Sequence, residues 1–194
     1  MNKASIFSFA LLTVITSGFA QTAPGNMMIG GGLRIFSDSY ENGSSASSTT
    51  FSPGFGYFVA DNFAVGTTLA ISGGRTGAGP GRTVRNSFGL GPFARYYMFT
   101  SNENFGFFGQ AQFVLGFGKT DHETNGVSRN RSFAFSIAPG AAYFFNEHWA
   151  MELSIVGLEF LSTDPDTEND NDKRNTIEVG LNTLIPNVGF RYHF

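Results

Sequence analysis

The last eight residues of the chain, 187–194, alternate between apolar and polar positions. One phase of the alternation holds the apolar residues Val188, Phe190, Tyr192 and Phe194. Successive side chains of a β-strand point to opposite faces, so this segment predicts a strand with one apolar and one polar face. The same alternation recurs through most of the chain, and it limits what the chain can fold into.

Eight alternating segments can be marked from residue 27 onward, at about 27–37, 49–60, 62–73, 83–99, 105–119, 131–145, 148–162 and 174–194. The apolar phase slips near Gly157 in the seventh segment and near Leu184 in the eighth. A slip of one residue turns the faces over, so we expect a β-bulge at each slip. Four prolines also lie inside the segments: Pro53, Pro92, Pro139 and Pro186. Because proline removes a ladder donor, we expect local bulges there too.

The connections between these segments alternate in length. Three are short and turn-like, at 60–62, 100–104 and 146–148. Four are longer and rich in Gly, Ser, Asn or Asp, at 37–48, 73–82, 120–130 and 162–173. This arrangement places both chain ends on the short-turn side. It is typical of an eight-stranded antiparallel up-and-down barrel, an all-β fold class.

The composition indicates that the apolar phase faces lipid. Charged residues make up 14% of the chain, against about 25% in an average globular domain. The polar phase is crowded with Gly, Ala and Ser, which suit a narrow barrel interior, whereas a soluble calyx with an apolar interior would carry many more outward charges. Five of the seven Tyr and Trp residues gather on the apolar phase near the short turns, as an interfacial girdle would: Tyr57, Tyr96, Tyr143, Trp149 and Tyr192. The sequence therefore predicts a transmembrane β-barrel.

Residues 1–20 have the three parts of a secretory signal peptide. Lys3 supplies the positive start, residues 6–15 form a short apolar run, and Ala20 is a small residue at the expected cleavage site. The run is too short to cross a bilayer, so we expect its removal and a barrel domain over 21–194.

The pattern of the whole mature chain, with its ending Gly-Phe-Arg-Tyr-His-Phe at 189–194, resembles small eight-stranded outer-membrane proteins of the OmpA-barrel, OmpX and OmpW type. It is similar to the broad porin-like group described as the outer membrane protein beta-barrel domain. The resemblance implies a monomer in the cell outer membrane, with Phe194 as a C-terminal signal for the barrel-assembly machinery. It also implies contact with outer-membrane lipid and lipopolysaccharide, and an extracellular partner for the loops.

The polar phase carries the few charged and amide side chains that should meet inside the barrel: Arg34, Arg95, Gln110, Gln112, Glu152, Arg191 and His193. The lumen of an eight-stranded barrel is just filled by side chains, so we expect a polar network that plugs it. The alternative is a narrow channel for small solutes or hydrophobic compounds. The pattern does not indicate which arginine pairs with Glu152.

The sequence lacks the common motifs for catalysis, nucleotide binding and metal binding, and each near match departs from its motif at a defined position. The chain has no cysteine, and a net charge of −3 gives no basic footprint for nucleic acid. The Gly-rich stretch 73–83 has Thr76 and Arg82 where a phosphate loop needs Gly and Lys. The acidic stretch 164–172 has Asn169 where an EF-hand needs Gly, although divalent ions shared with lipopolysaccharide phosphates stay open as an alternative.

Enzymatic activity is the least favoured alternative. Lipid A deacylases on such barrels use a His-x-Ser pair, and none of His122, His148 and His193 is followed by serine at that spacing. We therefore expect no catalytic residues, no cofactor and no metal. The sequence favours a structural or surface-interaction role, with the channel and the lipid-modifying enzyme as the other classes.

Overall fold

The computed structural model describes residues 20–39, 45–77, 81–123, 126–155, 157–165, 174–179 and 187–194. A single 3-10 turn, η1 (Ala20–Thr22), precedes the strands. The strands are β1 (Met27–Ser39), β2 (Ser45–Ala60), β3 (Phe63–Thr76), β4 (Thr83–Phe99), β5 (Phe105–His122), β6 (Gly126–Phe144), β7 (Trp149–Ser154), β8 (Leu158–Pro165), β9 (Arg174–Val179) and β10 (Asn187–His193).

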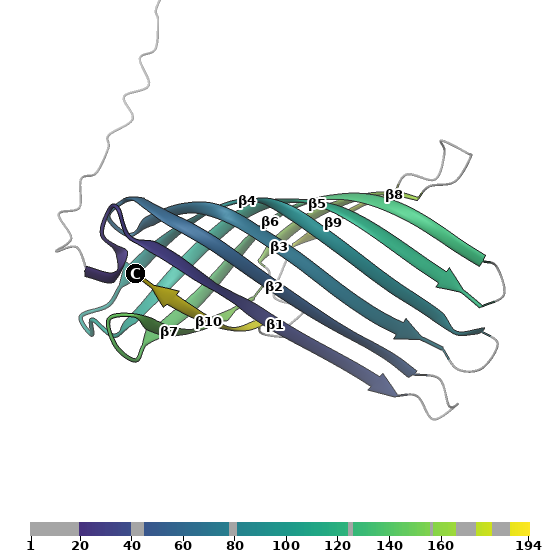
Figure 1. The fold of residues 1–194 in the computed structure, drawn as a ribbon, viewed down its shortest axis with the longest axis horizontal. Coiled ribbons are helices and arrows are strands. Elements are labelled where there is room, and N and C mark those ends of the chain that lie inside the picture. The colour runs from purple at the N-terminus through teal and green to yellow at the C-terminus, as the bar shows by residue number, and fades with distance from the viewer. Residues whose placement is uncertain are drawn as a thin grey trace, which may run out of the picture.

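The strands form one antiparallel sheet that closes on itself (Figure 1). Each of β1 to β6 pairs with the next along the chain, β6 pairs with β7, β7 with β10, and β10 with β1, which makes a ring of eight. The predicted all-β, up-and-down barrel of eight strands is confirmed. The β1–β10 ladder runs from Met28–His193 to Leu33–Val188, and among the described residues no ladder joins β9 to β1. Closure of the ring therefore depends on the β1–β10 seam.

The predicted seventh strand is divided into β7 and β8, which both pair with β6. Ser154 lies opposite Gly140, and Leu158 lies opposite Ile137. Between these two pairs there are three residues on the β7–β8 side and two on β6. The extra residue is a β-bulge, and it lies at the predicted slip beside Gly157. The predicted eighth strand comprises β9 and β10. The slip expected near Leu184 falls in 180–186, outside the described residues.

The bulges expected at the prolines are wrong for Pro53 and Pro92. Phe51 pairs with Ile71 and Gly54 with Thr68, so two residues face two across the ladder around Pro53. The β4–β5 register is likewise unchanged on either side of Pro92. A proline lacks one donor, and the neighbouring pairs hold the register without an inserted residue. The bulge near Pro139 lies on the opposite strand, and Pro186 lies outside the described residues.

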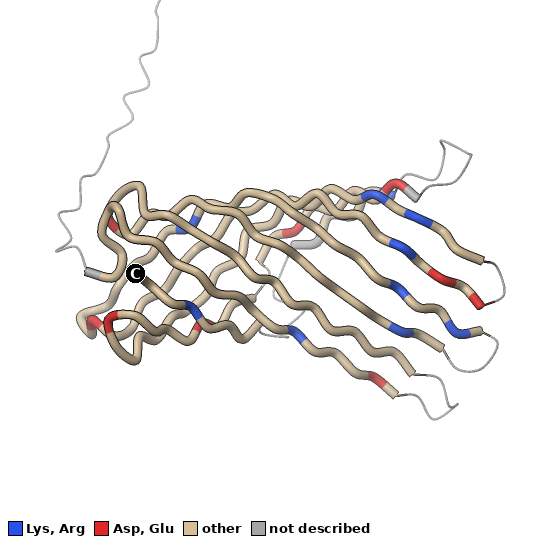
Figure 2. Tube along the Cα trace, viewed as in Figure 1, with Lys and Arg blue, Asp and Glu red and all other residues tan. Residues whose placement is uncertain are grey.

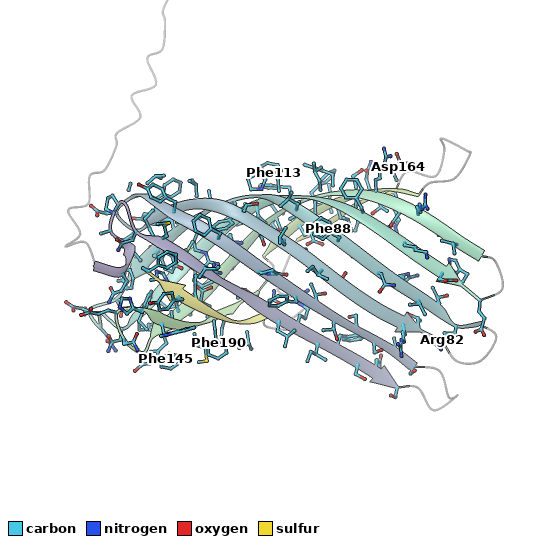
Figure 3. The ribbon with its side chains drawn as sticks, viewed as in Figure 1. Arg82, Phe88, Phe113, Phe145, Asp164 and Phe190 are labelled. Atoms are coloured by element: carbon cyan, nitrogen blue, oxygen red, sulfur yellow. The ribbon has the colours of Figure 1, made fainter. Side chains whose placement is uncertain are left out.

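The two faces of the sheet differ as the alternation predicts. Large apolar side chains such as Phe113, Leu115 and Phe190 are about half exposed on the outside, and Figure 3 shows Phe113 and Phe190 on the outer surface. Glycines on the inner face leave room for bulky neighbours, because a Cβ at Gly66 would lie 2.7 Å from the ring of Phe93. No helix among the described residues is long and apolar enough to cross a membrane.

The three short connections, Asp61–Asn62, Thr100–Asn104 and Phe145–His148, lie at the same end as the C-terminus, as Figure 1 shows. Asn62 has a positive φ of 62°, a conformation that asparagine tolerates in a tight turn. In outer-membrane barrels the short turns face the periplasm, so we expect this end to be the periplasmic one.

The C-terminal residue completes the seam. Phe194 accepts a hydrogen bond from the Met27 amide (2.7 Å) and donates one to the Met27 carbonyl (2.9 Å), and its ring stacks on Tyr192. Deleting Phe194 removes both hydrogen bonds and the ring, at about 1 kcal/mol per hydrogen bond. We expect the truncated protein to assemble into the outer membrane more slowly, measured by heat-modifiable migration over time. The control Phe194→Ala keeps the two backbone hydrogen bonds and removes only the ring, so it distinguishes the two contributions. Assembly of the deletion variant at the unmodified rate would contradict the role of Phe194.

The alternation of turn lengths also predicts which segments a protease reaches. A protease of broad specificity added to whole cells should cut within 37–48 or 162–173. Peptide mass spectrometry of the fragments identifies the sites, and permeabilised cells provide the control in which the short turns become accessible. Cleavage at Asn102 while the envelope is intact would reverse the orientation.

Candidate functional site in the barrel lumen

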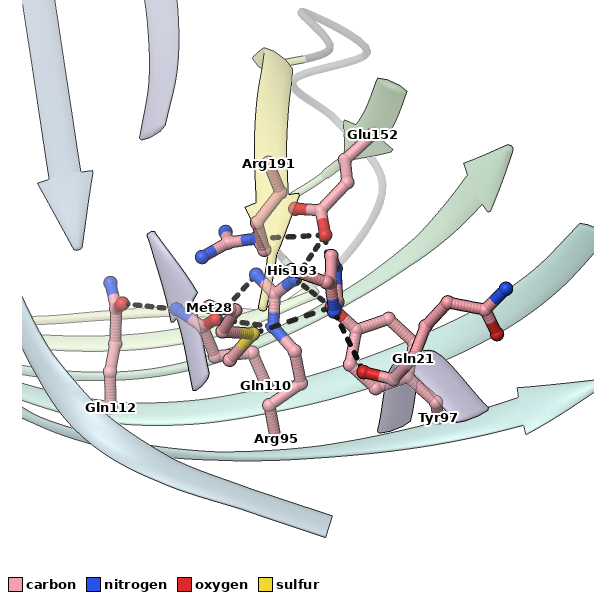
Figure 4. Close-up of polar contacts among 9 residues, drawn as sticks. All are labelled: Gln21, Met28, Arg95, Tyr97, Gln110, Gln112, Glu152, Arg191 and His193. Atoms are coloured by element: carbon pink, nitrogen blue, oxygen red, sulfur yellow. Dashed lines mark hydrogen bonds and ion pairs between the residues drawn. The ribbon is translucent and has the colours of Figure 1, made fainter. Parts of the chain in front are cut away.

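Near the short-turn end, the lumen holds an ionic cluster made by three strands (Figure 4). Glu152 on β7 accepts a hydrogen bond from Arg95 of β4 (Nη1 to Oε1, 2.6 Å) and another from Arg191 of β10 (Nε to Oε1, 2.9 Å). Tyr97 donates its hydroxyl to the same carboxylate oxygen at 3.0 Å. Arg95, Glu152 and Arg191 are each less than 10% exposed. Alternation on each strand directs these side chains inward, and the stagger of the strands brings them to one depth.

Amide side chains extend the cluster across the lumen. Arg95 donates through Nε and Nη2 to the Gln110 side-chain oxygen at 2.9 and 2.6 Å. Gln110 in turn donates to Gln112 at 2.7 Å. The Arg95 guanidinium also lies 4.1 Å from the centre of the Phe108 ring, within range of a cation–π interaction. Arg95 is therefore held by a carboxylate, an amide, a phenol and an aromatic face at once.

A layer of large buried side chains lies next to the ionic cluster, on the side of the short turns. Its members come from six strands and are at most 2% exposed: Met28, Phe58, Tyr97, Phe108, Phe144 and His193. Tyr97 belongs to both layers, because its ring lies 6.1 Å from that of Phe58 and 5.8 Å from that of Phe108. His193 packs on Phe144 at 5.1 Å. We call this group the aromatic layer.

The N-terminal turn covers the periplasmic opening. Thr22 is fully buried, and its hydroxyl donates a hydrogen bond to the Asn62 side-chain oxygen at 2.5 Å. The backbone N–H of Asn62 donates to the backbone carbonyl of Thr22 at 2.9 Å. His193 Nδ1 lies 3.2 Å from the Gln21 carbonyl oxygen. The residues just after the predicted signal peptide thus join the β2–β3 turn and the seam strand β10 into one floor.

On the other side of the ionic cluster the lumen is hollow and polar. A cavity of about 250 Å³ is lined by Arg34, Ser52, Thr68, Gln112 and Glu159, among others. Arg34 donates to the Asn187 side chain at 3.0 Å and does not join the ionic cluster. The lumen therefore changes from a polar cavity to a dense plug along its length.

The seven residues expected in the interior network occupy three places. Arg95, Glu152, Arg191, Gln110 and Gln112 meet in the ionic cluster, Arg34 lies in the cavity, and His193 belongs to the aromatic layer. Both Arg95 and Arg191 bind Glu152, which the alternation did not indicate.

Sequence reasoning missed the aromatic layer. Its signal is the inward phase itself, which carries large residues close to each short turn: Phe58, Tyr97, Phe108 and Phe144. The girdle residues, by contrast, lie on the outward phase at that end, with Tyr57, Tyr96, Tyr143 and Trp149 each more than 40% exposed and Tyr192 packed on Trp149.

The described parts of the loop motifs form no phosphate loop and no metal site. The Gly-rich stretch 73–83 begins in the last residues of β3 and ends at the first residue of β4. Most of the acidic stretch 164–172 lies outside the described residues, and within the described part of the chain no group of three or more His, Cys, Asp or Glu side chains is arranged to hold a metal.

A closed ring of eight antiparallel strands, apolar outside and polar within, with an aromatic girdle at the short-turn end, defines the class of outer-membrane β-barrel proteins. The chain belongs to the family of the outer membrane protein beta-barrel domain, whose model matches residues 7–183. Its location is therefore the outer membrane, among the lipids of that bilayer.

Several solved structures have a similar fold. OprG of Pseudomonas aeruginosa is 16% identical, with 90% of this chain and 98% of that chain covered and a TM-score of 0.53. Neisserial surface protein A is 16% identical, with 88% and 97% covered and a TM-score of 0.50. The N-terminal barrel domain of Pseudomonas aeruginosa OprF is 15% identical, with 88% and 98% covered and a TM-score of 0.50. At these identities the likeness is one of fold. No match was found among curated proteins.

The ionic cluster predicts a large cost for removing its carboxylate. Glu152→Ala leaves Arg95 and Arg191 buried without their counter-charge, and breaking such a pair costs about 3 kcal/mol. We expect lower stability in urea unfolding of the refolded barrel. The fluorescence of Trp149, the single tryptophan, reports the transition from outside the lumen.

Gln112→Ala is the matched control, because it removes an inward polar side chain at the end of the network and leaves no charge unpaired. We expect the control to shift the transition by less than half as much. Equal unfolding of Glu152→Ala and the unmodified protein would mean that the cluster does not support the barrel.

Proposed function

We propose that this protein is a sealed structural barrel, which anchors surface loops in the outer membrane and does not conduct solutes. The observation that carries the proposal is the stacking of two plugs at one end of the lumen. The ionic cluster fills the cross-section with paired charges, and the aromatic layer fills the next with rings from opposite walls.

The chemistry of the two layers supports a seal. A hydrated ion would have to separate Glu152 from two arginines and then cross rings that leave Met28, Phe58 and Tyr97 fully buried. Desolvated pairs resist separation, because each partner would remain as an uncompensated buried charge. The floor formed by Thr22 and Asn62 adds a third barrier.

A sealed lumen leaves the loops and the outer surface as the parts that can interact. The barrel then serves as a monomeric scaffold, and the longer connections at the end opposite the short turns carry the contacts with an extracellular partner. Assembly depends on the terminal Phe194 at the seam, which fits recognition by the barrel-assembly machinery.

The channel is the second candidate, and the polar cavity of about 250 Å³ beside the ionic cluster is the observation in its favour. A role as an enzyme has less support. His148 and His193 lie at the short-turn end, where the His148 ring contacts the His193 carbonyl at 2.9 Å, and His122 contacts the hydroxyl of Thr83 and not a serine.

Planar-bilayer conductance separates the seal from the channel. We expect the refolded, unmodified barrel to show almost no steady current. The double variant Phe58→Ala/Tyr97→Ala removes two rings of the aromatic layer and one hydroxyl of the ionic cluster, so it should conduct.

The matched control is Phe107→Ala/Phe113→Ala, which removes two outward rings of the barrel wall and should leave the lumen closed. Steady conductance of the unmodified protein would favour the channel. A double variant that folds and stays closed would show that the aromatic layer is not part of the barrier.

A further inference from the structure

The outer surface changes from apolar to basic on three strands, at the end away from the short turns. On β5 the exposed Phe117 is followed on the same face by Lys119. Arg129 on β6 and Arg75 on β3 are exposed on that face as well. Figure 2 shows basic residues gathered at this end of the barrel. In an outer-membrane barrel, such a change is expected where the hydrocarbon layer gives way to headgroups.

The register places the polar residues of this region side by side. Asn86 of β4 pairs with Lys119, and Lys119 pairs with Arg129. In the adjacent outward row Phe88 pairs with Phe117. Directly opposed residues of antiparallel strands have Cβ atoms about 5 Å apart, so the donors form a line along the edge of an apolar strip. We call Asn86, Lys119 and Arg129 the basic row.

The surface is hollowed at the basic row. A shallow groove of about 410 Å³ has Ile71, Phe88 and Phe117 on its apolar side and the basic row on its polar side. A second hollow of about 480 Å³ adjoins it at Asn86 and is lined by Gly73 and Arg75. Because Gly73 has no side chain, the second hollow stays open beside the donor groups of Arg75 and Asn86.

Acids on the same face do not cancel the basic row. Arg131 lies in register with Asp164, so that pair carries no net charge. Asp121 lines a separate hollow with Arg82 and Glu123, nearer the loop. Lys119 and Arg129 are therefore a surplus of positive charge directly above apolar surface.

The opposite end of the barrel has the reverse charge. Its three short turns contain Asp61, Glu103 and Glu147 and no Lys or Arg. Among the described residues, the outward basic row therefore lies at the end opposite the short turns. This is the outer-leaflet side in the expected orientation, which indicates a ligand specific to that leaflet. The outer leaflet of this membrane consists of a phosphorylated, multiply acylated glycolipid, the lipid A part of lipopolysaccharide.

We propose that the groove binds one lipid A molecule, with a phosphate on Lys119 and Arg129 and an acyl chain along Phe88 and Phe117. Arginine offers a phosphate two parallel N–H donors, and lysine adds a point charge. Asn86 supplies a neutral donor between the two hollows, and Arg75 extends the site toward the rest of the headgroup. The proposal depends on the outward face alone, so it stands whether or not the lumen conducts.

Titration calorimetry of the refolded full chain in detergent micelles tests the site with two probes. The probes are bisphosphorylated lipid A and the same lipid with both phosphates removed. We expect the phosphorylated lipid to bind at least about tenfold more tightly, with an affinity that falls as salt is raised. Equal affinity for the two lipids would overturn the proposal.

The variant Lys119→Gln/Arg129→Gln should weaken binding of phosphorylated lipid A by about tenfold and leave the dephosphorylated lipid unaffected. The matched control is Arg85→Gln/Arg174→Gln, which removes the same charge at the same end from positions whose register directs them into the lumen. The affinity of the control for phosphorylated lipid A should stay within about twofold of that of the unmodified protein. An equal loss in the control would place the lipid's charge partner in the lumen and overturn the proposal.

Folding of each variant is checked by heat-modifiable migration. If the Lys119→Gln/Arg129→Gln variant does not fold, the comparison of the two lipids on the unmodified protein decides, together with Phe117→Ala. That variant should weaken both lipids alike, because it removes an acyl contact and no charge. If Phe117→Ala weakened binding of the phosphorylated lipid alone, Phe117 would not be the acyl-chain contact that we assign to it.

Discussion

The structure depends on the requirement that every backbone N–H and C=O inside the hydrocarbon layer finds a partner within the protein. A sheet meets it only by closing, and this chain closes through the ladder between β1 and β10. The seam ends in the reciprocal pair between Met27 and Phe194, so the last residue of the chain lies where the ring is sealed. Closure encloses the polar phase of each strand in a lumen and leaves the apolar phase outside.

Closure with eight strands leaves a narrow lumen, and the chain fills it unevenly. Glycines such as Gly66 make room for Phe93, and large rings crowd the periplasmic end. A buried carboxylate between two arginines lies at the boundary between this dense part and the polar cavity. Such a cluster need not add net stability over an apolar core, but it penalises any arrangement that separates its members. It therefore ties the adjacent strands β7 and β10 to β4 on another part of the wall.

The outer surface is adapted to two different boundaries. At the short-turn end, Tyr and Trp residues with apolar bodies and polar tips lie on the outward face beside acidic turns, as the predicted interfacial girdle requires. At the other end, the apolar strip gives way to the basic row and to shallow grooves. The two ends of the barrel wall thus differ in side-chain type and in charge, independently of what the lumen does.

The sequence by itself determined the elements of this fold, because each depends on local alternation. The period of two marks eight strands and their outward faces, the slip at Gly157 marks a bulge, and the turn residues mark the short connections. Only the tertiary structure decided which side chains meet, since depth in a barrel depends on the stagger between strands. Arg95 and Glu152 are 57 residues apart and Arg191 and Glu152 are 39 apart, and no local pattern relates their heights. The same stagger placed His193 among rings, left Arg34 with Asn187, and set Lys119 beside Arg129.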